Sequence, residues 1–497
     1  MNIIHGDCLE ELKKLDDNSV DAVITDPPYG LSNTKPQQVA DVLKAWVTGD
    51  TVSVPAKRGG FMGKDWDSFV PPPAVWEECM RVLKPGGHMA VFAGARTQDL
   101  MGLSIRLAGF EIRDTLGWIY GSGFPKSMDV SKAIDKGQGK NRQRQLEFTE
   151  WMRSTGITAT QINEATETNM GGHYLTAASQ PAIATADLFD KLRPLLPEVP
   201  ERIERLVAER TGIEWTDYVK REVVGKYQSG LHTGPSGVGG HGEGGEVTTS
   251  HSDAAKQWDG WGTALKPAIE PIILARKPLD GTVANNVLTH GVGGLNIDAC
   301  RVSTDDDTSR TPSVVGDTSA PMGRGIAMGG RGHSAGRFPA NVLLDEHAAK
   351  EMDKQSGVLK DRGNKSESKS TYSGGGATSF ANGANFPFAY DAGGGASRFF
   401  PVFKYQAKAP KKERPVIERE DGSKIQHPTV KPLALLEWLV ELITPPGGVV
   451  LDPFAGSGTT LQAAINKGFT PIGIEQDADY IKLIEKRLEA TCTTHKN

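Results

Sequence analysis

Strand and helix patterns alternate at both ends of this 497-residue chain but not through its middle. Seven short apolar runs are typical of buried strands, at 2–5, 20–25, 88–93, 110–120, 268–275, 448–452 and 470–475. Strands that alternate with helices predict an α/β fold, with a Rossmann-like, mostly parallel sheet covered by helices on both faces. Because six of the seven runs lie near the chain ends, the sheet must be built from both ends around large insertions.

These patterns divide the chain into five segments, 1–124, 125–265, 266–280, 281–425 and 426–497. The first and last segments carry the alternation, and the short third segment holds the remaining strand. Within the first insertion, 145–212 is predicted to be helical and the glycine-rich 229–247 to be a mobile loop. Near the N-terminus, a helix that Pro73 opens is expected to end at Gly86-Gly87.

Charge does not mark the chain as a general nucleic-acid binder, because such proteins are often basic overall and the formal net charge here is −5. Local basic segments are either solvated surface or contacts for DNA. They contain Lys132, Lys136, Lys140, Arg142 and Arg144, and Lys404, Lys408, Lys411, Lys412 and Arg414.

Composition also bears on the expected cellular location and on metal binding. No run of about 18 apolar residues is present, so no membrane span is expected, and the N-terminus lacks a secretory pattern. Cys8, Cys79, Cys300 and Cys492 are scattered, with no C-x-x-C pair. They fit neither a zinc site nor a disulfide framework, so no metal is predicted and a reducing cytosol is the expected location.

A glycine turn near the C-terminus predicts a cofactor site. In VVLDPFAGSGTTLQAA, a strand is followed by Gly456-Ser457-Gly458 and then a helix. The next strand ends at Glu475, and an acidic residue about 20 residues beyond such a turn is placed to accept hydrogen bonds from ribose hydroxyls. Asp452 would repel a pyrophosphate, and no G-x-x-x-x-G-K-[ST] loop is present. A cationic sulfonium suits this turn better, which favours S-adenosylmethionine.

The tetrapeptide Asp26-Pro27-Pro28-Tyr29 follows the strand VDAVIT, at the strand end where open α/β sheets place their ligands. An exocyclic amine on a nucleobase is a poor nucleophile, because its lone pair is delocalised into the ring. The Asp26 carboxylate and the Pro27 carbonyl offer two acceptors for the amine hydrogens, and proline adds no competing N–H. The Tyr29 ring can stack on a base, and the same acceptors stabilise positive charge on the attacked nitrogen.

Together these motifs resemble the amino-group DNA methyltransferases, which methylate adenine N6 or cytosine N4. The catalytic motif precedes the cofactor motif, as in the permuted β-type arrangement. GDC (6–8), RVLKPGG (81–87), GWIYGSGFPKS (117–127) and HPTVKP (427–432) are similar to further elements of that family. The resemblance implies a seven-stranded methyltransferase sheet whose last two strands, 110–120 and 268–275, are antiparallel.

The resemblance also implies roles for individual residues. Asp7 would contact the cofactor adenine, the HPTVKP segment would pack over the methionine end, and Trp118 would line the base pocket beside Tyr29. The cofactor-binding residues would be Asp7, Thr429, Lys431, Asp452, Phe454, Gly456, Ser457, Gly458, Thr459 and Glu475. The catalytic residues would be Asp26, Pro27, Pro28 and Tyr29.

By this resemblance the expected activity is site-specific methyl transfer from S-adenosylmethionine to adenine N6 in double-stranded DNA, by base flipping and direct transfer. Asp at the first motif position favours adenine over cytosine N4. An RNA or protein-amide methyltransferase and a non-catalytic DNA-binding protein are weaker possibilities. Target recognition is expected in 281–425, in 125–265 or in both. A homodimer, a separately encoded restriction nuclease, and a bacterial or phage origin with action in the cytoplasm stay open.

Overall fold

The computed structural model describes residues 2–32, 34–55, 67–121, 127–138, 140–176, 180–209, 223–226, 246–248, 253–304, 336–357, 394–403, 414–419 and 422–494. The chain forms two compact units. The first unit comprises 1–123 and 268–497, and the second comprises 124–267. The predicted mobile loop at 229–247 lies outside the described residues except at 246–247.

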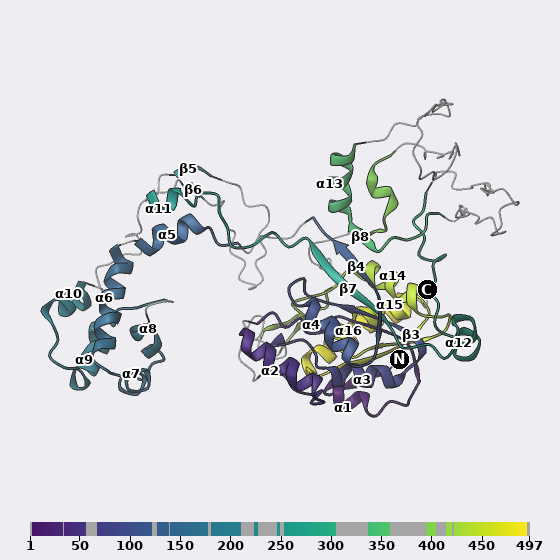
Figure 1. The fold of residues 1–497 in the computed structure, drawn as a ribbon, viewed down its shortest axis with the longest axis horizontal. Coiled ribbons are helices and arrows are strands. Elements are labelled where there is room, and N and C mark those ends of the chain that lie inside the picture. The colour runs from purple at the N-terminus through teal and green to yellow at the C-terminus, as the bar shows by residue number, and fades with distance from the viewer. Residues whose placement is uncertain are drawn as a thin grey trace, which may run out of the picture. The chain divides into compact units, whose positions relative to one another are not determined.

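A twisted sheet forms the centre of the first unit (Figure 1). It has nine strands, in the order β1-β13-β12-β2-β3-β7-β4-β8-β9. Its strands are β1 (Asn2–His5), β2 (Val20–Thr25), β3 (Leu83–Phe92), β4 (Glu111–Ile119), β7 (Ile269–Arg276), β8 (Val342–Asp345), β9 (Val402–Phe403), β12 (Val449–Asp452) and β13 (Thr470–Glu475). Only β7 runs antiparallel to its neighbours. The predicted α/β fold with a mostly parallel sheet is confirmed.

The two chain ends meet inside this sheet. β12, from the C-terminal part, pairs in parallel with β2, from the N-terminal part, and Val450 lies opposite Ala22. The hydroxyl of Thr25 at the end of β2 donates to Oδ1 of Asp452 at the end of β12, over 2.7 Å. The strand before Asp26 and the strand before the glycine turn are therefore direct neighbours.

All seven predicted strands belong to the sheet, and β4 and β7 form the expected antiparallel pair. The count of seven was nevertheless short by two, because β8 and β9 extend the sheet beyond β4. These strands have four and two residues. Runs this short carry too little alternation to stand out within 281–425.

One predicted helix end was wrong. α3 (Pro73–Val82) begins at Pro73 as expected but ends at Val82, and Leu83 is already extended and paired with Val20. The register then shifts before Ala22 pairs with His88, so the intervening residues form an irregular start to β3. Residues after Val82 that the helical pattern had predicted to be helix therefore belong to the strand β3.

Helices cover both faces of the sheet. Those of the first unit are α1 (Cys8–Leu12), α2 (Pro36–Val47), α3, α4 (Gln98–Leu107), α12 (Val283–His290), α13 (Glu346–Ser356), α14 (Leu433–Ile443), α15 (Thr459–Asn466) and α16 (Ala478–Thr494). Successive strand residues point to opposite faces, so Val23 and Val91 join one apolar cluster while Ile24 and Phe92 join the other. This burial on both faces holds the strand ends in a fixed register.

The second unit has its own apolar core, which includes Phe148, Met152, Tyr174, Phe189 and Leu206. Its elements are α5 (Val130–Gln138), α6 (Lys140–Ser154), α7 (Ala159–Thr166), α8 (Gly171–Leu175), α9 (Ala186–Leu192), α10 (Glu201–Glu209), α11 (Asp253–Lys256) and the pair β5 (Val223–Lys226) and β6 (Glu246–Thr248). The described part of 145–212 is largely helical, as predicted. Across the described ranges, no helix is both long and apolar enough to cross a membrane.

Candidate active site

The site lies where β2, β12 and β13 end on the same edge of the sheet. Asp26 follows β2, Asp452 ends β12 and Glu475 ends β13. Because these strands are parallel, their carboxyl ends converge, and open α/β sheets bind ligands at this edge. Segments more than 400 residues apart in sequence thereby form one region.

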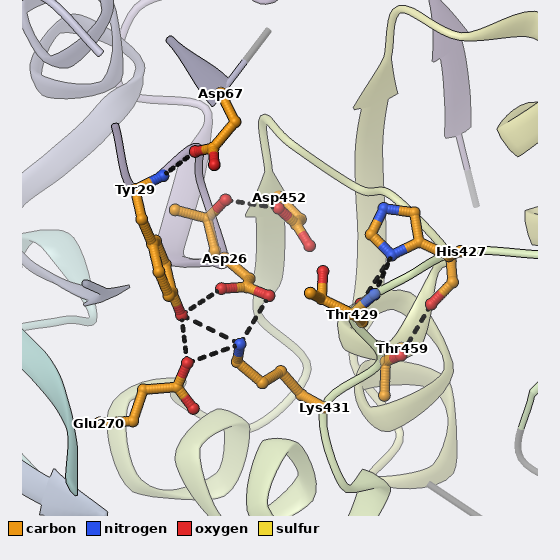
Figure 2. A network of polar contacts seen from close by, with 11 residues as sticks. Asp26, Tyr29, Asp67, Glu270, His427, Thr429, Lys431, Asp452 and Thr459 are labelled. Carbon is orange, nitrogen blue, oxygen red and sulfur yellow. Dashed lines mark hydrogen bonds and ion pairs between the residues drawn. The ribbon is translucent and has the colours of Figure 1, made fainter. Parts of the chain in front are cut away.

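Asp26, Tyr29, Glu270 and Lys431 form a hydrogen-bonded group, here called the catalytic cluster (Figure 2). The Tyr29 hydroxyl lies 2.7 Å from Oδ1 of Asp26 and 2.6 Å from Oε1 of Glu270. Nζ of Lys431 lies 2.9 Å from Oδ2 of Asp26 and 3.0 Å from both the Tyr29 hydroxyl and Oε1 of Glu270. An ammonium has three N–H bonds, so these three acceptors account for all of them.

Burial makes the charges of this cluster interdependent. The Lys431 side chain is only 10% exposed. Burial alone would lower the pKa of Lys431, but the Asp26 and Glu270 carboxylates reverse this effect and raise it. Burial, followed by the charges of Asp26 and Glu270, raises the pKa of Tyr29 well above its usual value, so its hydroxyl stays protonated. Two carboxylates and one ammonium give the cluster one net negative charge.

The backbone of the Asp26–Tyr29 loop is anchored from outside. Oδ1 of the buried Asp67 accepts from the backbone N–H of Tyr29 at 2.7 Å and of Gly30 at 3.0 Å. The Thr97 hydroxyl donates to the Tyr29 carbonyl at 2.6 Å. Burial raises the pKa of Asp67, and its backbone hydrogen bonds partly offset that rise. Both backbone polar groups of Tyr29 are thus satisfied, and Pro27 is buried beside them.

Trp118, the predicted wall of the base pocket, lies in β4 and is 5% exposed. It pairs directly with Glu270 across the β4–β7 register, so the two side chains project from the same face of the sheet. Tyr29 packs against the apolar cluster that contains Trp118. The structure therefore brings Trp118 and the catalytic cluster to one face, and its contact with a base stays a prediction.

The glycine turn is closed by Glu475. The backbone N–H of Gly456 donates to Oε2 of Glu475 at 2.7 Å, and that of Asp477 donates to Oε1 at 2.8 Å. Gly456 has a φ of +52°, and a Cβ there would lie 3.0 Å from Nε2 of His427. Burial raises the pKa of Glu475 from its usual 4.5 to about 7, although both backbone hydrogen bonds lower it.

Asp452 is buried deeper than the turn itself. It is 2% exposed, and its Oδ1 accepts from the Thr25 hydroxyl and from the Phe454 backbone N–H at 3.1 Å. Burial raises the pKa of Asp452 to about 6, against the opposing effect of its hydrogen bonds. Its position under the turn suits a residue that holds the turn and supplies negative potential.

The other predicted cofactor residues lie at different depths. Ser457, Gly458 and Thr459 continue the turn into α15; the side-chain oxygens of Ser457 and Thr459 are 3.2 Å apart, and both residues are buried. The Phe454 ring lies 6.4 Å from that of Trp76, so it packs on the apolar cluster that contains Val23 and Val91.

Asp7 and the HPTVKP segment complete the predicted set. Asp7 caps α1 by accepting from the backbone N–H of Leu9, and the adjacent Gly6 donates to the Glu475 carbonyl at 3.0 Å. The Thr429 carbonyl lies 2.6 Å from Nδ1 of His427, and both oxygen and nitrogen belong to a segment that turns toward Gly456. Lys431, predicted to bind cofactor, makes its observed contacts in the catalytic cluster.

Three residues of the site were not singled out from the sequence: Glu270, Asp67 and His427. Glu270 had a readable signal, because it is the one acidic residue in the apolar strand IEPIILAR. Asp67 had none, since its contact with the Tyr29 loop, 38 positions earlier in the sequence, depends on the tertiary fold. His427 belonged to the HPTVKP motif, and its packing on Gly456 is a tertiary contact.

Comparison with known proteins identifies the family to which the sequence belongs. A family model described as DNA methylase, N6_N4_Mtase, matches residues 20–178 and 336–486. The chain is 46% identical over 70 residues to Type II methyltransferase M2.DpnII of Streptococcus pneumoniae. This aligned segment covers 14% of this chain and 26% of the relative. It is 51% identical over 63 residues to DNA adenine methyltransferase YhdJ of Escherichia coli (strain K12), covering 13% and 21%.

The aligned segments thus span about a quarter of these relatives' own length. Among solved structures, a putative DNA modification methylase of Thermus thermophilus, complexed with S-adenosyl-L-methionine, is similar at 15% identity. The alignment covers 99% of this chain and 96% of that one, with a TM-score of 0.33. The family match extends over more than half of the chain, and this chain therefore belongs to the N6/N4 DNA methylase family.

Proposed function

We propose that the protein is a site-specific DNA methyltransferase that transfers a methyl group from S-adenosylmethionine to the N6 amine of adenine. The observation that carries this proposal is the pairing of β2 with β12, which sets the Asp26–Tyr29 loop beside the acidic glycine turn. A group that binds an amine and a group that suits a cationic cofactor are then neighbours. Neither motif alone would support the reaction.

The donor set of the turn fits S-adenosylmethionine. Asp452 and Glu475 supply negative charge, which suits a ligand with a sulfonium and an ammonium group. A Cβ at Gly456 would lie 3.0 Å from the His427 ring, which is tighter than an ordinary contact, so the turn packs closely on the HPTVKP segment. We assign Glu475 to the ribose hydroxyls and Asp7 to the adenine end. The bound cofactor would supply an electrophilic methyl group.

The chain's own residues would hold and activate the base. Asp26 and the Pro27 carbonyl would accept the two amine hydrogens, which localises the nitrogen lone pair. Tyr29 and Trp118 would flank the ring, which must leave the duplex to reach this edge of the sheet. Much of the rate would come from this positioning, and no cysteine nucleophile is required.

Adenine N6 is preferred over cytosine N4 for two reasons. Asp26 occupies the first position of the motif, where adenine enzymes more often carry Asp and cytosine enzymes Ser. The relative YhdJ is named an adenine methyltransferase, although the matched segment is short. Cytosine N4 methylation is the second candidate, because the matching family covers both amines.

DNA would be the partner, and the regions outside the shared core would read it. In the second unit, 155–190 contains no Lys or Arg, so α7 and α8 are poor candidates for phosphate contact. Arg142 and Arg144, near the start of α6, are better candidates. Segment 281–425 stays the other proposed recognition region.

The test is to incubate the purified protein with unmethylated DNA and S-adenosylmethionine, digest the DNA to nucleosides and identify the products by mass spectrometry. N6-methyladenine is the expected product, in an amount that depends on protein and cofactor. N4-methylcytosine would overturn the choice of base, and no methylated nucleoside would overturn the activity. Sequencing the modified DNA would then identify the recognition site.

A further inference from the structure

Glu270 contributes to the catalytic cluster from β7, a strand that carries neither of the two motifs. Its side chain is 17% exposed, and its Oε1 lies 2.6 Å from the Tyr29 hydroxyl and 3.0 Å from Nζ of Lys431 (Figure 2). A carboxylate within an apolar central strand requires such partners, because burying it without them is costly. Its position is therefore built into the sheet and is not a chance surface contact.

The Tyr29 hydroxyl has one proton and two acceptors. It accepts from Lys431 at 3.0 Å, so its own proton goes either to Oδ1 of Asp26 at 2.7 Å or to Oε1 of Glu270 at 2.6 Å. When the proton goes to Asp26, both carboxylate oxygens of Asp26 are engaged, because Lys431 holds Oδ2. Oδ1 is then a weaker acceptor for any further donor.

The proposed reaction requires Asp26 to accept a hydrogen from the substrate amine. We propose that Glu270 is a positioning residue, which takes the Tyr29 proton and so leaves Oδ1 of Asp26 available for that amine. Lys431 supports the arrangement by donating to both carboxylates and to the Tyr29 oxygen. The inference rests on the proposed function, but it makes a separate statement about which acceptor the tyrosine uses.

Glu270→Gln is the first variant, because glutamine keeps a similar size and a neutral acceptor oxygen but loses the charge. Without that charge, the Tyr29 proton and Lys431 both shift toward Asp26. Single-turnover methyl transfer on bound DNA should fall at least about tenfold, as expected when a charge-assisted hydrogen bond is lost. Dissociation constants for DNA and for S-adenosylmethionine should stay within about twofold, since Glu270 touches neither in this scheme.

Tyr29→Phe makes the test specific, because phenylalanine keeps a ring but has no proton to place. In the Tyr29→Phe background, adding Glu270→Gln should cost less than about threefold, since only the shift of Lys431 toward Asp26 remains. Equal losses in both backgrounds would overturn the inference, as would wild-type rates for Glu270→Gln alone. Weaker binding of DNA or cofactor with an unchanged transfer rate would also overturn it.

Glu111→Gln is the matched control, because Glu111 lies on the neighbouring β4 at the far end of the same strand pair and bonds to Arg276. It should transfer methyl groups at the wild-type rate. A loss as large as that of Glu270→Gln would mean that any charge change on this pair is disruptive, which would overturn a specific role for Glu270. An inactive wild-type protein would instead refute the proposed function, so the two failures are distinguishable.

Discussion

The catalytic cluster and the glycine turn each contain two acidic side chains, but they balance the charge differently. In the cluster, Lys431 lies 2.9 Å from Asp26 and 3.0 Å from Glu270. At the turn, the observed donors to Asp452 and Glu475 are hydroxyl and backbone N–H groups. Over the described part of the chain, no Lys or Arg forms an ion pair with either carboxylate at the turn.

This difference assigns distinct tasks to the two regions. In the cluster, Lys431 offsets one of the two carboxylate charges, and a neutral nucleobase would add no further charge to be compensated. At the turn, burial raises the pKa values of both carboxylates, and a positively charged ligand would lower them by stabilising the ionised forms. The chain's charges thus match a neutral substrate on one side and a cationic cofactor on the other.

The largest expected effect separates the two regions by removing Asp26. Asp26→Ala should reduce methyl transfer about a thousandfold, the upper range for loss of one preorganised electrostatic group. Cofactor affinity should stay near wild type, because Asp26 belongs to the cluster and not to the turn. Radiolabelled methyl transfer and calorimetric titration of S-adenosylmethionine measure the two quantities. Near-wild-type transfer by this variant would refute the catalytic assignment.

A second experiment disturbs the turn and leaves the cluster intact. Gly456→Ala places a side chain at φ +52° and against His427. The free turn would relieve this strain by moving out of its binding geometry, and restoring that geometry at a cost of about 2 kcal/mol would weaken cofactor binding about thirtyfold. Gly468→Ala is the control, because Gly468 has a φ of +79° but nothing within 4 Å of the point where a Cβ would lie. The control should lose stability to backbone strain while keeping cofactor affinity. Similar affinity for both variants would contradict the role of the turn.

The smallest effect is a pH dependence that belongs to the turn alone. Burial raises the pKa of Glu475 to about 7, so the ligand-free fold binds its proton more readily than the unfolded chain does. Its contribution to stability is therefore lost as the pH rises from about 4.5 through 7. Binding a cation needs the ionised form, so affinity should rise about eightfold between about pH 6 and pH 7.5.

Calorimetry at these two pH values measures the change in affinity. Glu475→Gln is the control, because glutamine cannot titrate. Its weaker affinity should rise only about twofold over this range, since Asp452, with a pKa of about 6, still ionises. An eightfold rise that persists in the control would assign the dependence to another group. Constant affinity in the wild type would mean that the Glu475 charge does not contribute to binding.

The local sequence pattern was sufficient to place a motif in the fold where the motif consists of a few consecutive residues. The Asp26–Tyr29 loop follows a strand, and Gly456-Ser457-Gly458 separates a strand from a helix, so sequence order alone predicts both placements. The helix from Pro73 shows the limit of such reasoning. Its helical pattern continued past Val82, but pairing of Leu83 with Val20 ended it, because sheet hydrogen bonds are decided by a distant segment.

The sequence by itself determined the family resemblance, the α/β class, the seven core strands and the requirement that both chain ends share one sheet. Only the tertiary structure decided that Glu270 and Lys431 join Asp26 and Tyr29, that Asp67 holds the loop, and that β8 and β9 extend the sheet. The physical reason is the separation along the sequence over which each kind of interaction acts. Strand and turn preferences act over a few residues, whereas a buried charge is stabilised by whatever partner the folded chain brings within about 3 Å.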